Sequence, residues 1–253
     1  MADALLSVDQ ITFRYGRFTA VSGVSFDIHA GERCALLGAN GAGKTTLLNA
    51  LAGVTTPTEG RILYKGADIT RASAAERSRL GIGRSFQRTN IFPFLSVLQN
   101  VRLAVQALQG GGSLNPWREV DSIESWHADA MRALAQVGLD KEPARIAQDL
   151  SYGEQRQLEL AICLAARPEL LLLDEPTAGM SPAETQDVVG LLLERIPATV
   201  TLLIVEHDLE VVERVARRVL VMETGALLAD GTPEQVRSDA RVQEAYLRGH
   251  QLA

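Results

Sequence analysis

The sequence predicts an α/β protein, and three observations lead to this fold class. The apolar runs Cys34 to Leu37, Leu170 to Leu173 and Val200 to Val205 are unbroken and each precedes helical sequence, which is typical of parallel strands buried on both faces. Near the N-terminus apolar and polar residues alternate instead, which predicts an antiparallel β layer. Between about Asn90 and Leu150 the buried-strand signal disappears, and a helical insertion into the α/β core is the simplest account.

The alternating pattern is found in two segments. Apolar side chains occupy every second position from Ile11 to Tyr15 and again from Val24 to Ile28, which is the period of a half-buried strand. Late in the chain, the apolar runs Val219 to Met222 and Ala226 to Ala229 are joined through Glu223-Thr224-Gly225. This pair of runs predicts a β-hairpin.

Helix starts are marked by capping boxes, in which a Ser or Thr is followed three residues later by Glu or Gln. Pro182 and Pro233 fall at the first helical position of two of them. In the predicted insertion, helical segments at Val97 to Gln109 and Ile123 to Val137 flank the break Gly110-Gly111-Gly112. The boxes are Ser73 with Glu76, Ser151 with Glu154, Ser181 with Glu184, and Thr232 with Gln235.

The composition is that of a globular protein of 253 residues, with 46% hydrophobic and 22% charged residues. A net charge of -6 leaves no basic footprint, so nucleic acid is not an expected partner. Cys34 and Cys163 lack the spacing of a metal or redox motif and are expected to be small core residues.

The N-terminal segment does not have the pattern of a signal peptide. The longest apolar runs are far shorter than the roughly 20 residues that a membrane-spanning helix needs.

The strongest motif is Gly38-Ala39-Asn40-Gly41-Ala42-Gly43-Lys44-Thr45, which fits the phosphate-loop pattern G-x-x-x-x-G-K-[ST] between a buried strand and helical sequence. Glycines let successive backbone N–H groups point into one concavity, and the helix N-terminus adds its dipole. Lys44 would reach the β- and γ-phosphates, and the Thr45 hydroxyl would be a ligand of Mg²⁺. The residues expected to bind the nucleotide here are Gly38, Asn40, Gly41, Gly43, Lys44, Thr45 and Thr46.

Two adjacent carboxylates, Asp174 and Glu175, end the predicted strand at Leu170. A parallel strand delivers its last residues to the sheet edge that carries the phosphate loop, so Asp174 is expected in the Mg²⁺ shell. Successive strand side chains point apart, so Glu175 is aimed elsewhere and is expected to orient the attacking water. The alternative interpretation is a pair of solvated acids at a strand end, which the phosphate loop makes much less attractive.

The segment Leu150-Ser151-Tyr152-Gly153-Glu154-Gln155 stands about twenty residues before these carboxylates, and here the chain resembles the ABC transporter ATPases, whose signature is usually written L-S-G-G-Q. By itself the segment is a capping box. In the family this helix N-terminus faces the γ-phosphate bound by a second subunit. The resemblance therefore implies that Ser151 and Gly153 contact the ATP of a partner. Tyr152 and Glu154 depart from the commonest signature.

Three more positions take their roles from the resemblance. Gln87 falls where the family has a glutamine that approaches Mg²⁺ and the attacking water and ties the core to the helical subdomain. His207 resembles the histidine that senses the γ-phosphate. Tyr15 stands where the family has an aromatic ring stacked on adenine, with Phe13 and Phe18 nearby. The resemblance thus implies Glu175, His207 and Gln87 as catalytic residues, and Thr45, Gln87 and Asp174 as metal ligands.

The resemblance covers almost the whole chain and implies one ABC ATPase domain over residues 1–253. Residues 1–88 and 156–253 would form the β layer and a RecA-like P-loop NTPase core, and 89–155 a helical subdomain that ends in the signature. Where the family commonly has an Asp that reaches across the dimer, this chain has Ser181. The substitution keeps the helix-capping role of the position but not its charge.

Within the family the chain looks most like the ATP-binding subunits of branched-chain amino-acid importers, with lipopolysaccharide-export ATPases as the alternative. The implied machine is a dimer of ATP-binding subunits, with ATP and Mg²⁺, at the cytoplasmic face of a bacterial inner membrane. Its expected partners are a second such subunit and permease subunits that dock near Gln87 to Leu95, with a solute-binding protein engaged indirectly. Buried subdomain core is the alternative for Phe94 and Leu95.

Two rivals come from other functional classes. A soluble ABC-type ATPase of DNA repair or translation would carry long coiled-coil insertions or two cassettes, and neither fits this sequence. A noncatalytic regulatory subunit would use ATP only as a clamp, and the intact set Lys44, Asp174, Glu175, Gln87 and His207 argues against it. ATP hydrolysis coupled to transport is therefore the expected activity.

Overall fold

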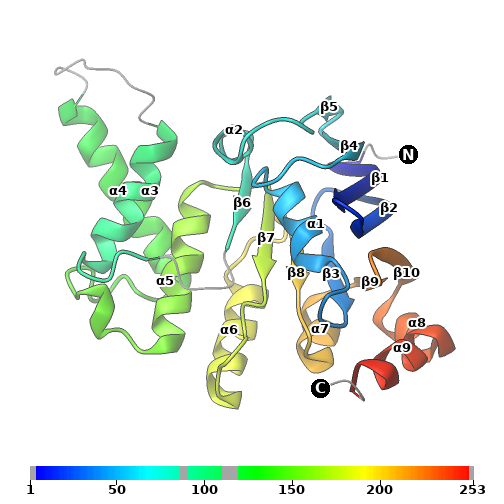
Figure 1. The fold of residues 1–253 in the computed structure, drawn as a ribbon. Coiled ribbons are helices and arrows are strands. Elements are labelled where there is room, and N and C mark those ends of the chain that lie inside the picture. The colour runs from blue at the N-terminus through cyan, green and yellow to red at the C-terminus, as the bar shows by residue number, and fades with distance from the viewer. Residues whose placement is uncertain (1–3, 86–90, 110–118, 251–253) are drawn as a thin grey trace.

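The computed structural model describes residues 4–85, 91–109 and 119–250. Its centre is a six-stranded sheet, in which four strand pairs are parallel and the edge strand β10 is antiparallel to β9 (Figure 1). In spatial order the strands are β10 (Ala226–Gly231), β9 (Arg218–Glu223), β3 (Arg33–Gly38), β8 (Thr201–Val205), β7 (Leu170–Asp174) and β6 (Ile82–Arg84). The predicted parallel strands and the predicted hairpin are therefore confirmed.

A second, antiparallel sheet lies beside the first one and contains β2 (Phe18–Ile28), β1 (Leu6–Tyr15), β4 (Glu59–Tyr64) and β5 (Ala67–Asp68) in that order. The alternation seen in the sequence confirms β1 and β2. β4, β5 and β6 were not predicted from the sequence. β5 and β6 are too short to show a pattern, and β4 has only two buried residues, which lie in a polar stretch.

The two faces of the six-stranded sheet are covered by different partners, which explains the unbroken apolar runs. On β3, Cys34 and Leu36 pack with helix α1 (Lys44–Leu51) and the antiparallel sheet. Ala35 and Leu37 point the other way and share a core with α6 (Pro182–Glu194) and α7 (Leu209–Val215). Burying a leucine side chain such as Leu36 or Leu37 contributes about 1.5–3 kcal/mol. Because both faces of β3 are covered, apolar residues are favoured at every position of the strand.

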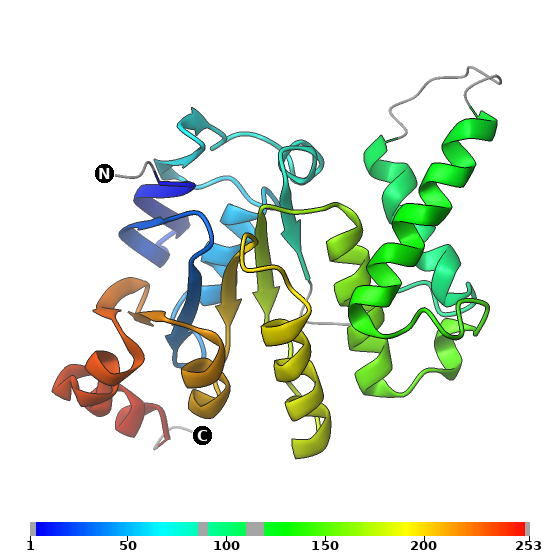
Figure 2. The same cartoon turned by 180° about the vertical axis from the view of Figure 1, so that it is seen from behind.

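The helices between β6 and β7 stand to one side of the sheet, as Figures 1 and 2 show from opposite directions. They are α3 (Val97–Gln109), α4 (Glu119–Val137), the 3-10 turn Ala147–Asp149 and α5 (Tyr152–Ala165). The first predicted helix has the observed bounds, and the second begins four residues earlier than its apolar pattern. The predicted Gly110–Gly112 break lies outside the described residues.

All four predicted capping boxes are present. The Ser or Thr side chain accepts from the backbone N–H three residues later, and the Glu or Gln side chain accepts in return from the cap backbone. They begin α2 (Ala74–Arg79), α5, α6 and α8 (Pro233–Ser238), and α9 (Ala240–His250) follows.

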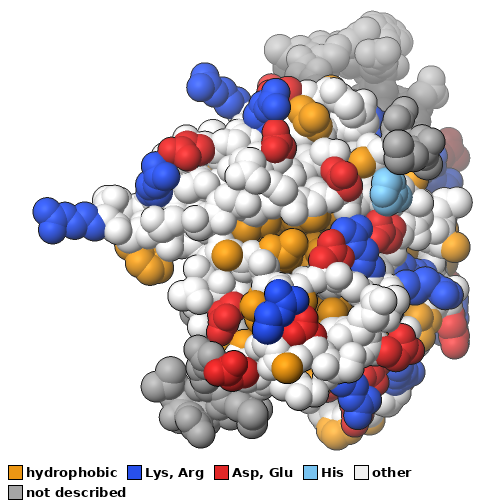
Figure 3. All heavy atoms as spheres, turned by 90° about the vertical axis from the view of Figure 1, so that its right-hand side faces the viewer, with side chains coloured by type: hydrophobic (Ala, Val, Ile, Leu, Met, Phe, Trp, Pro, Cys, Tyr) orange, Lys and Arg blue, Asp and Glu red, His pale blue; other side chains and the backbone are white. Residues whose placement is uncertain are grey.

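The surface carries charges of both signs. Lys and Arg side chains are interspersed with Asp and Glu on the face seen from the right of Figure 1, beside the antiparallel sheet and the last helices (Figure 3). Within the part of the chain that the structure describes, no helix combines the length and the apolar character required to cross a membrane.

Candidate functional site

Two glycines of the loop between β3 and α1 occupy positions that leave no room for a side chain. Gly38 and Gly43 have φ angles of 151° and 98°. A Cβ atom on Gly38 would lie 2.3 Å from the carbonyl oxygen of Met222, and one on Gly43 would lie 2.5 Å from that of Ala20. The positive φ angles let the backbone curl around a small anionic group. The absence of side chains lets the loop pack closely on β9 and β2.

Helix α1 begins at Lys44, and among the described residues no side chain caps its N-terminus. The first turn of an α-helix leaves backbone N–H groups without partners in the helix, which makes it an anion site. The Lys44 Nζ atom donates to the carbonyl oxygens of Gly38 and Ala39, at 2.7 and 3.0 Å. Burial lowers the pKa of Lys44, and the charges of Glu175 and Asp174 oppose that shift. The Lys44 ammonium therefore lies against the loop backbone, close enough to Glu175 and Asp174 to interact with their charges.

The other end of α1 is fixed by Arg77, whose side chain is buried. Its guanidinium donates to the carbonyl oxygens of Ala50 and Leu51 at the last turn of α1, at 2.5 and 2.8 Å, and to that of Ile69 at 2.6 Å. Burial lowers the pKa of Arg77 to about 10. A cation at a helix C-terminus interacts favourably with the helix dipole, so Arg77 holds the helix that presents the phosphate loop.

The carboxyl ends of β3, β8 and β7 lie at one edge of the sheet, since Leu36 pairs with Val205 and Val205 pairs with Asp174. The Asp174 side chain is 1% exposed, and its Oδ1 atom has no hydrogen-bond partner in the described part of the chain. Its Oδ2 atom lies 3.7 Å from the Arg84 guanidinium. Burial raises the pKa of Asp174, while Arg84 opposes that shift. An unsatisfied buried carboxylate oxygen is costly without a cation, and this fits a Mg²⁺ ligand.

Glu175 follows β7 in the left-handed region, with φ at 47°. Its backbone N–H donates to the Val205 carbonyl at 2.9 Å. Its Oε1 atom lies 2.5 Å from Nε2 of His207, which follows β8. Because Glu175 lies beyond the last residue of β7, the left-handed turn rather than the strand period directs its side chain. Glu175 and His207 thus form one hydrogen-bonded pair beside the phosphate loop.

Glu206 is a functional candidate that the sequence analysis missed. Its carboxylate is buried and accepts from the Thr177 N–H and hydroxyl, at 3.1 and 2.7 Å, and from the His207 N–H at 3.1 Å. Burial raises the pKa of Glu206, and the bonds from Thr177 oppose the shift. Glu206, directly after β8, therefore ties that strand end to the loop that follows Glu175. An acidic residue directly after the apolar run that ends at Val205 could have indicated it in the sequence.

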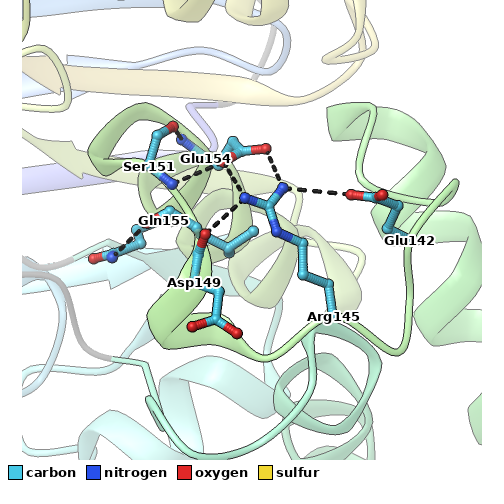
Figure 4. A network of polar contacts seen from close by, with 7 residues as sticks. Glu142, Arg145, Asp149, Ser151, Glu154 and Gln155 are labelled. Carbon is cyan, nitrogen blue, oxygen red and sulfur yellow. Dashed lines mark hydrogen bonds and ion pairs between the residues drawn. The ribbon is translucent and has the colours of Figure 1, made fainter.

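Ser151 and Gly153 stand at the N-terminus of α5. Ser151 forms the capping box with Glu154, whose carboxylate also pairs with Arg145 at 2.7 Å (Figure 4). Burial acts to raise the pKa of Glu154, but the backbone of Ser151 and the Arg145 guanidinium outweigh it and lower that pKa. Arg145 also donates to the Asp149 carbonyl at 2.7 Å. Glu154 departs from the usual signature, and its carboxylate holds the residues just before α5 in place through Ser151 and Arg145.

The structure brings the predicted residues of the phosphate loop, Asp174, Glu175 and His207 together. Tyr15 lies at the tip of the β1–β2 hairpin, paired with Phe18, and both rings are largely exposed. Ala20, two residues beyond Phe18, is the residue against which Gly43 packs. Gln87 lies outside the described residues.

Two family profiles match the chain. One is described as ABC transporter and matches residues 21–178. The other is described as branched-chain amino acid ATP-binding cassette transporter and matches residues 226–247. Among curated proteins, the high-affinity branched-chain amino acid transport ATP-binding protein LivG of Escherichia coli K12 is 36% identical over 252 residues, covering 98% of this chain and 99% of LivG. The lipopolysaccharide export system ATP-binding protein LptB of Haemophilus influenzae is 31% identical, covering 96% and 97%.

Solved structures give the same result. The ADP conformation of an ATP-binding cassette of an ABC transporter matches with a TM-score of 0.84 and 29% identity, over 97% of this chain and 99% of that one. A dimeric bacterial ABC transporter cassette matches with a TM-score of 0.76 and 24% identity, over 90% and 98%. The second likeness concerns the fold alone.

Proposed function

Because the chain belongs to the ABC transporter ATPases, we propose that its ATP hydrolysis powers an importer of branched-chain or other hydrophobic amino acids or related small carboxylates. The observation that carries the proposal is the meeting of Lys44, Asp174 and the Glu175–His207 pair at one sheet edge. The match at residues 226–247, over β10 and the last two helices, supports the amino-acid importer.

The chemistry follows from this chain's own groups. The phosphate loop and α1 bind the triphosphate, and Lys44 exchanges its two carbonyl contacts for phosphate oxygens. Thr45 and Asp174 would hold Mg²⁺, with Gln87 as a further proposed ligand, and the ion would neutralise negative charge on the phosphates. Glu175 orients and deprotonates the attacking water, and His207 contacts the γ-phosphate while it fixes the Glu175 carboxylate. Tyr15 stacks on the adenine ring.

We propose that each ATP is shared by two subunits, with Ser151 and Gly153 of one chain facing the γ-phosphate held by the other. The dimeric cassette supports the arrangement through its shared fold only. The contacts of Gly153 in this chain are with Glu184 of α6. ATP can drive closure because the γ-phosphate would touch the signature only in the closed dimer, and a population shift requires such a difference in affinity.

The permease subunit is proposed to dock on the loop before α3, at the cytoplasmic face of the membrane. Phe92 and Phe94 are 58% and 80% exposed, so Phe94 is not part of the subdomain core. The Phe92 backbone is anchored to α3, because the Asn100 side chain accepts from the Phe92 N–H at 2.8 Å and donates to its carbonyl at 3.0 Å. A pair of exposed aromatic rings on an anchored backbone suits an apolar helix of a membrane subunit.

Two measurements test the proposal. The purified chain should hydrolyse Mg²⁺–ATP, and Lys44→Ala should remove ATP binding. Lys65→Ala, which removes an exposed ion pair with Glu169 and a cation–π contact with Tyr64, should not. Reconstituted with the two membrane subunits and binding protein of an amino-acid importer, the chain should support ATP-dependent leucine uptake. Support of lipopolysaccharide export in place of uptake would favour the alternative that the LptB likeness raises.

The docking step has its own test. Phe92→Asp should abolish assembly with the permease while ATP binding by the isolated chain persists. A matched change at an exposed apolar residue elsewhere, Leu193→Asp on α6, should leave assembly intact. Unchanged transport and assembly in Phe92→Asp would refute docking at this loop.

A further inference from the structure

The signature helix is bonded to the loop that carries the catalytic carboxylate of the same chain. The Tyr152 hydroxyl, in the first turn of α5, lies 3.0 Å from the Ala178 carbonyl oxygen. The Ala178 N–H in turn donates to the Glu175 carbonyl oxygen at 3.1 Å. Two hydrogen bonds therefore connect the residue beside Ser151 with the backbone of Glu175.

The direction of the Tyr152 bond is fixed by a neighbouring cation. Arg156 donates to the Tyr152 oxygen at 3.1 Å, and its guanidinium lies 5.4 Å from the ring centroid. The same guanidinium pairs with Glu159 at 2.8 Å, where both side chains are about 95% buried (6% and 5% exposed). A guanidinium can only donate, so the Tyr152 oxygen accepts from Arg156 and its O–H is left to donate to Ala178.

A second contact joins the same two segments. Glu184 caps α6 by accepting from the Ser181 N–H at 2.9 Å and from its hydroxyl at 2.7 Å. The position of a Cβ atom on Gly153 would lie 3.3 Å from Cγ and Oε1 of Glu184. The pKa of Glu184 is lowered, chiefly by the backbone and side chain of Ser181 and also by a bond from the Gly153 backbone. The segment from Ala178 to Glu184 is thus attached to α5 at both of its ends.

The backbone of Glu175 requires such bracing. A left-handed conformation at a residue other than glycine is strained and persists only where the surroundings enforce it. The Val205 carbonyl holds the N–H side of Glu175, and the turn closed by Ala178 holds the carbonyl side.

We propose that Tyr152 is a positioning residue: through Ala178 it makes the signature helix and Glu175 of one chain move as a unit. On the proposed function, on which this inference rests, Ser151 and Gly153 engage the ATP of the partner. Tyr152 then passes that engagement to the chain's own Glu175, so that each subunit becomes competent when its signature is occupied. The link runs inside one chain and needs no charge at Ser181.

The test separates the two roles of one chain by pairing different variants. In the first pair, Tyr152→Phe chains are mixed with a large excess of Glu175→Gln chains, so the live site uses Glu175 of a chain that lacks the hydroxyl. In the second, wild-type chains are mixed with an excess of the double variant Tyr152→Phe and Glu175→Gln, so only the signature of the live site lacks it. Wild-type chains mixed with an excess of Glu175→Gln chains are the reference.

We expect kcat to fall about fivefold in the first pair, since one hydrogen bond is lost, with the KM for ATP unchanged. The second pair should match the reference. A loss confined to the second pair, or no loss in either, would overturn the proposal. Tyr64→Phe is the matched control, because the Tyr64 hydroxyl is buried without a hydrogen-bond partner among the described residues, and it should leave kcat unchanged.

Amide hydrogen exchange and ATP-dependent dimerisation separate the bracing from the proposed function. Amide hydrogen exchange of residues 176–181 in the nucleotide-free Tyr152→Phe chain should be faster than in wild type, with the rest of α5 unaltered; unaltered exchange at 176–181 contradicts the bracing. The proposed function fails separately, if the Glu175→Gln chain does not form an ATP-dependent dimer. Tyr152→Phe added to Glu175→Gln should leave that dimer intact, because Ser151 and Gly153 are unchanged.

Discussion

Nε2 of His207 lies 2.5 Å from Oε1 of Glu175, although 31 residues separate them in the chain. At this distance the imidazole nitrogen and the carboxylate oxygen are hydrogen-bonded. The contact joins the segment that follows β7 to the segment that follows β8.

Glu175→Gln should bind ATP with affinity close to that of wild type and lose hydrolysis by at least about 100-fold, because an amide cannot take the proton of the attacking water. Dimers formed with ATP should therefore persist, which size-exclusion chromatography with light scattering will detect. Glu213→Gln, at an exposed pair with Arg237, is the control and should behave as wild type. Full turnover by Glu175→Gln would refute the general-base role.

His207→Ala should reduce kcat by about 10- to 100-fold, since it removes both the partner of the Glu175 carboxylate and the proposed γ-phosphate contact. ATP affinity should change much less than kcat, because the phosphate loop is untouched. The measurement is steady-state hydrolysis together with nucleotide binding by calorimetry. His29→Ala, at the exposed end of β2, should have no effect; equal losses in the two variants would contradict the assignment.

Glu206→Gln should lower kcat about tenfold and destabilise the fold by about 1–3 kcal/mol. Three donors, two from Thr177 and one from His207, converge on this carboxylate. The amide nitrogen of Gln must oppose at least one of them. Urea unfolding and steady-state kinetics check the two effects. Retention of both stability and kcat would show that the carboxylate is not needed to hold the two loops.

Asp174→Asn tests the buried carboxylate through the pH dependence of stability. Burial raises the pKa of Asp174 in the folded protein above its ordinary 3.8. Its contribution to stability is therefore full below about pH 3.8 and is lost as pH rises through the folded pKa. Above that pKa the ionised carboxylate carries a cost that Asn does not.

The nucleotide-free Asn variant should accordingly unfold at a higher temperature than wild type at pH 8, and the difference should shrink as the pH falls toward 4. The stabilisation by Mg²⁺–ATP, measured in the same thermal scans, should be lost. Asp27→Asn, on the exposed edge of β2, provides the comparison. A variant that unfolds below wild type at pH 8 would contradict the sign of the pKa shift.

Much of the fold followed from local pattern. The strands at Cys34, Leu170 and Thr201 were predictable because both faces of a covered parallel sheet demand apolar residues. The capping boxes were predictable because their bonds join residues three apart. By contrast β6, with three residues, was missed, since its pairing with β7 leaves no periodic signal.

For the site, the sequence determined the chemistry of each segment: a phosphate loop ending in Lys44 and Thr45, carboxylates after one buried strand and a histidine after another. These depend on residue type and short spacing. Only the tertiary structure decided which groups meet, such as Glu175 with His207, Glu206 with Thr177, and Tyr152 with Ala178. Those partners are far apart in the chain, and the order of strands in the sheet and the left-handed turn at Glu175 bring them into contact.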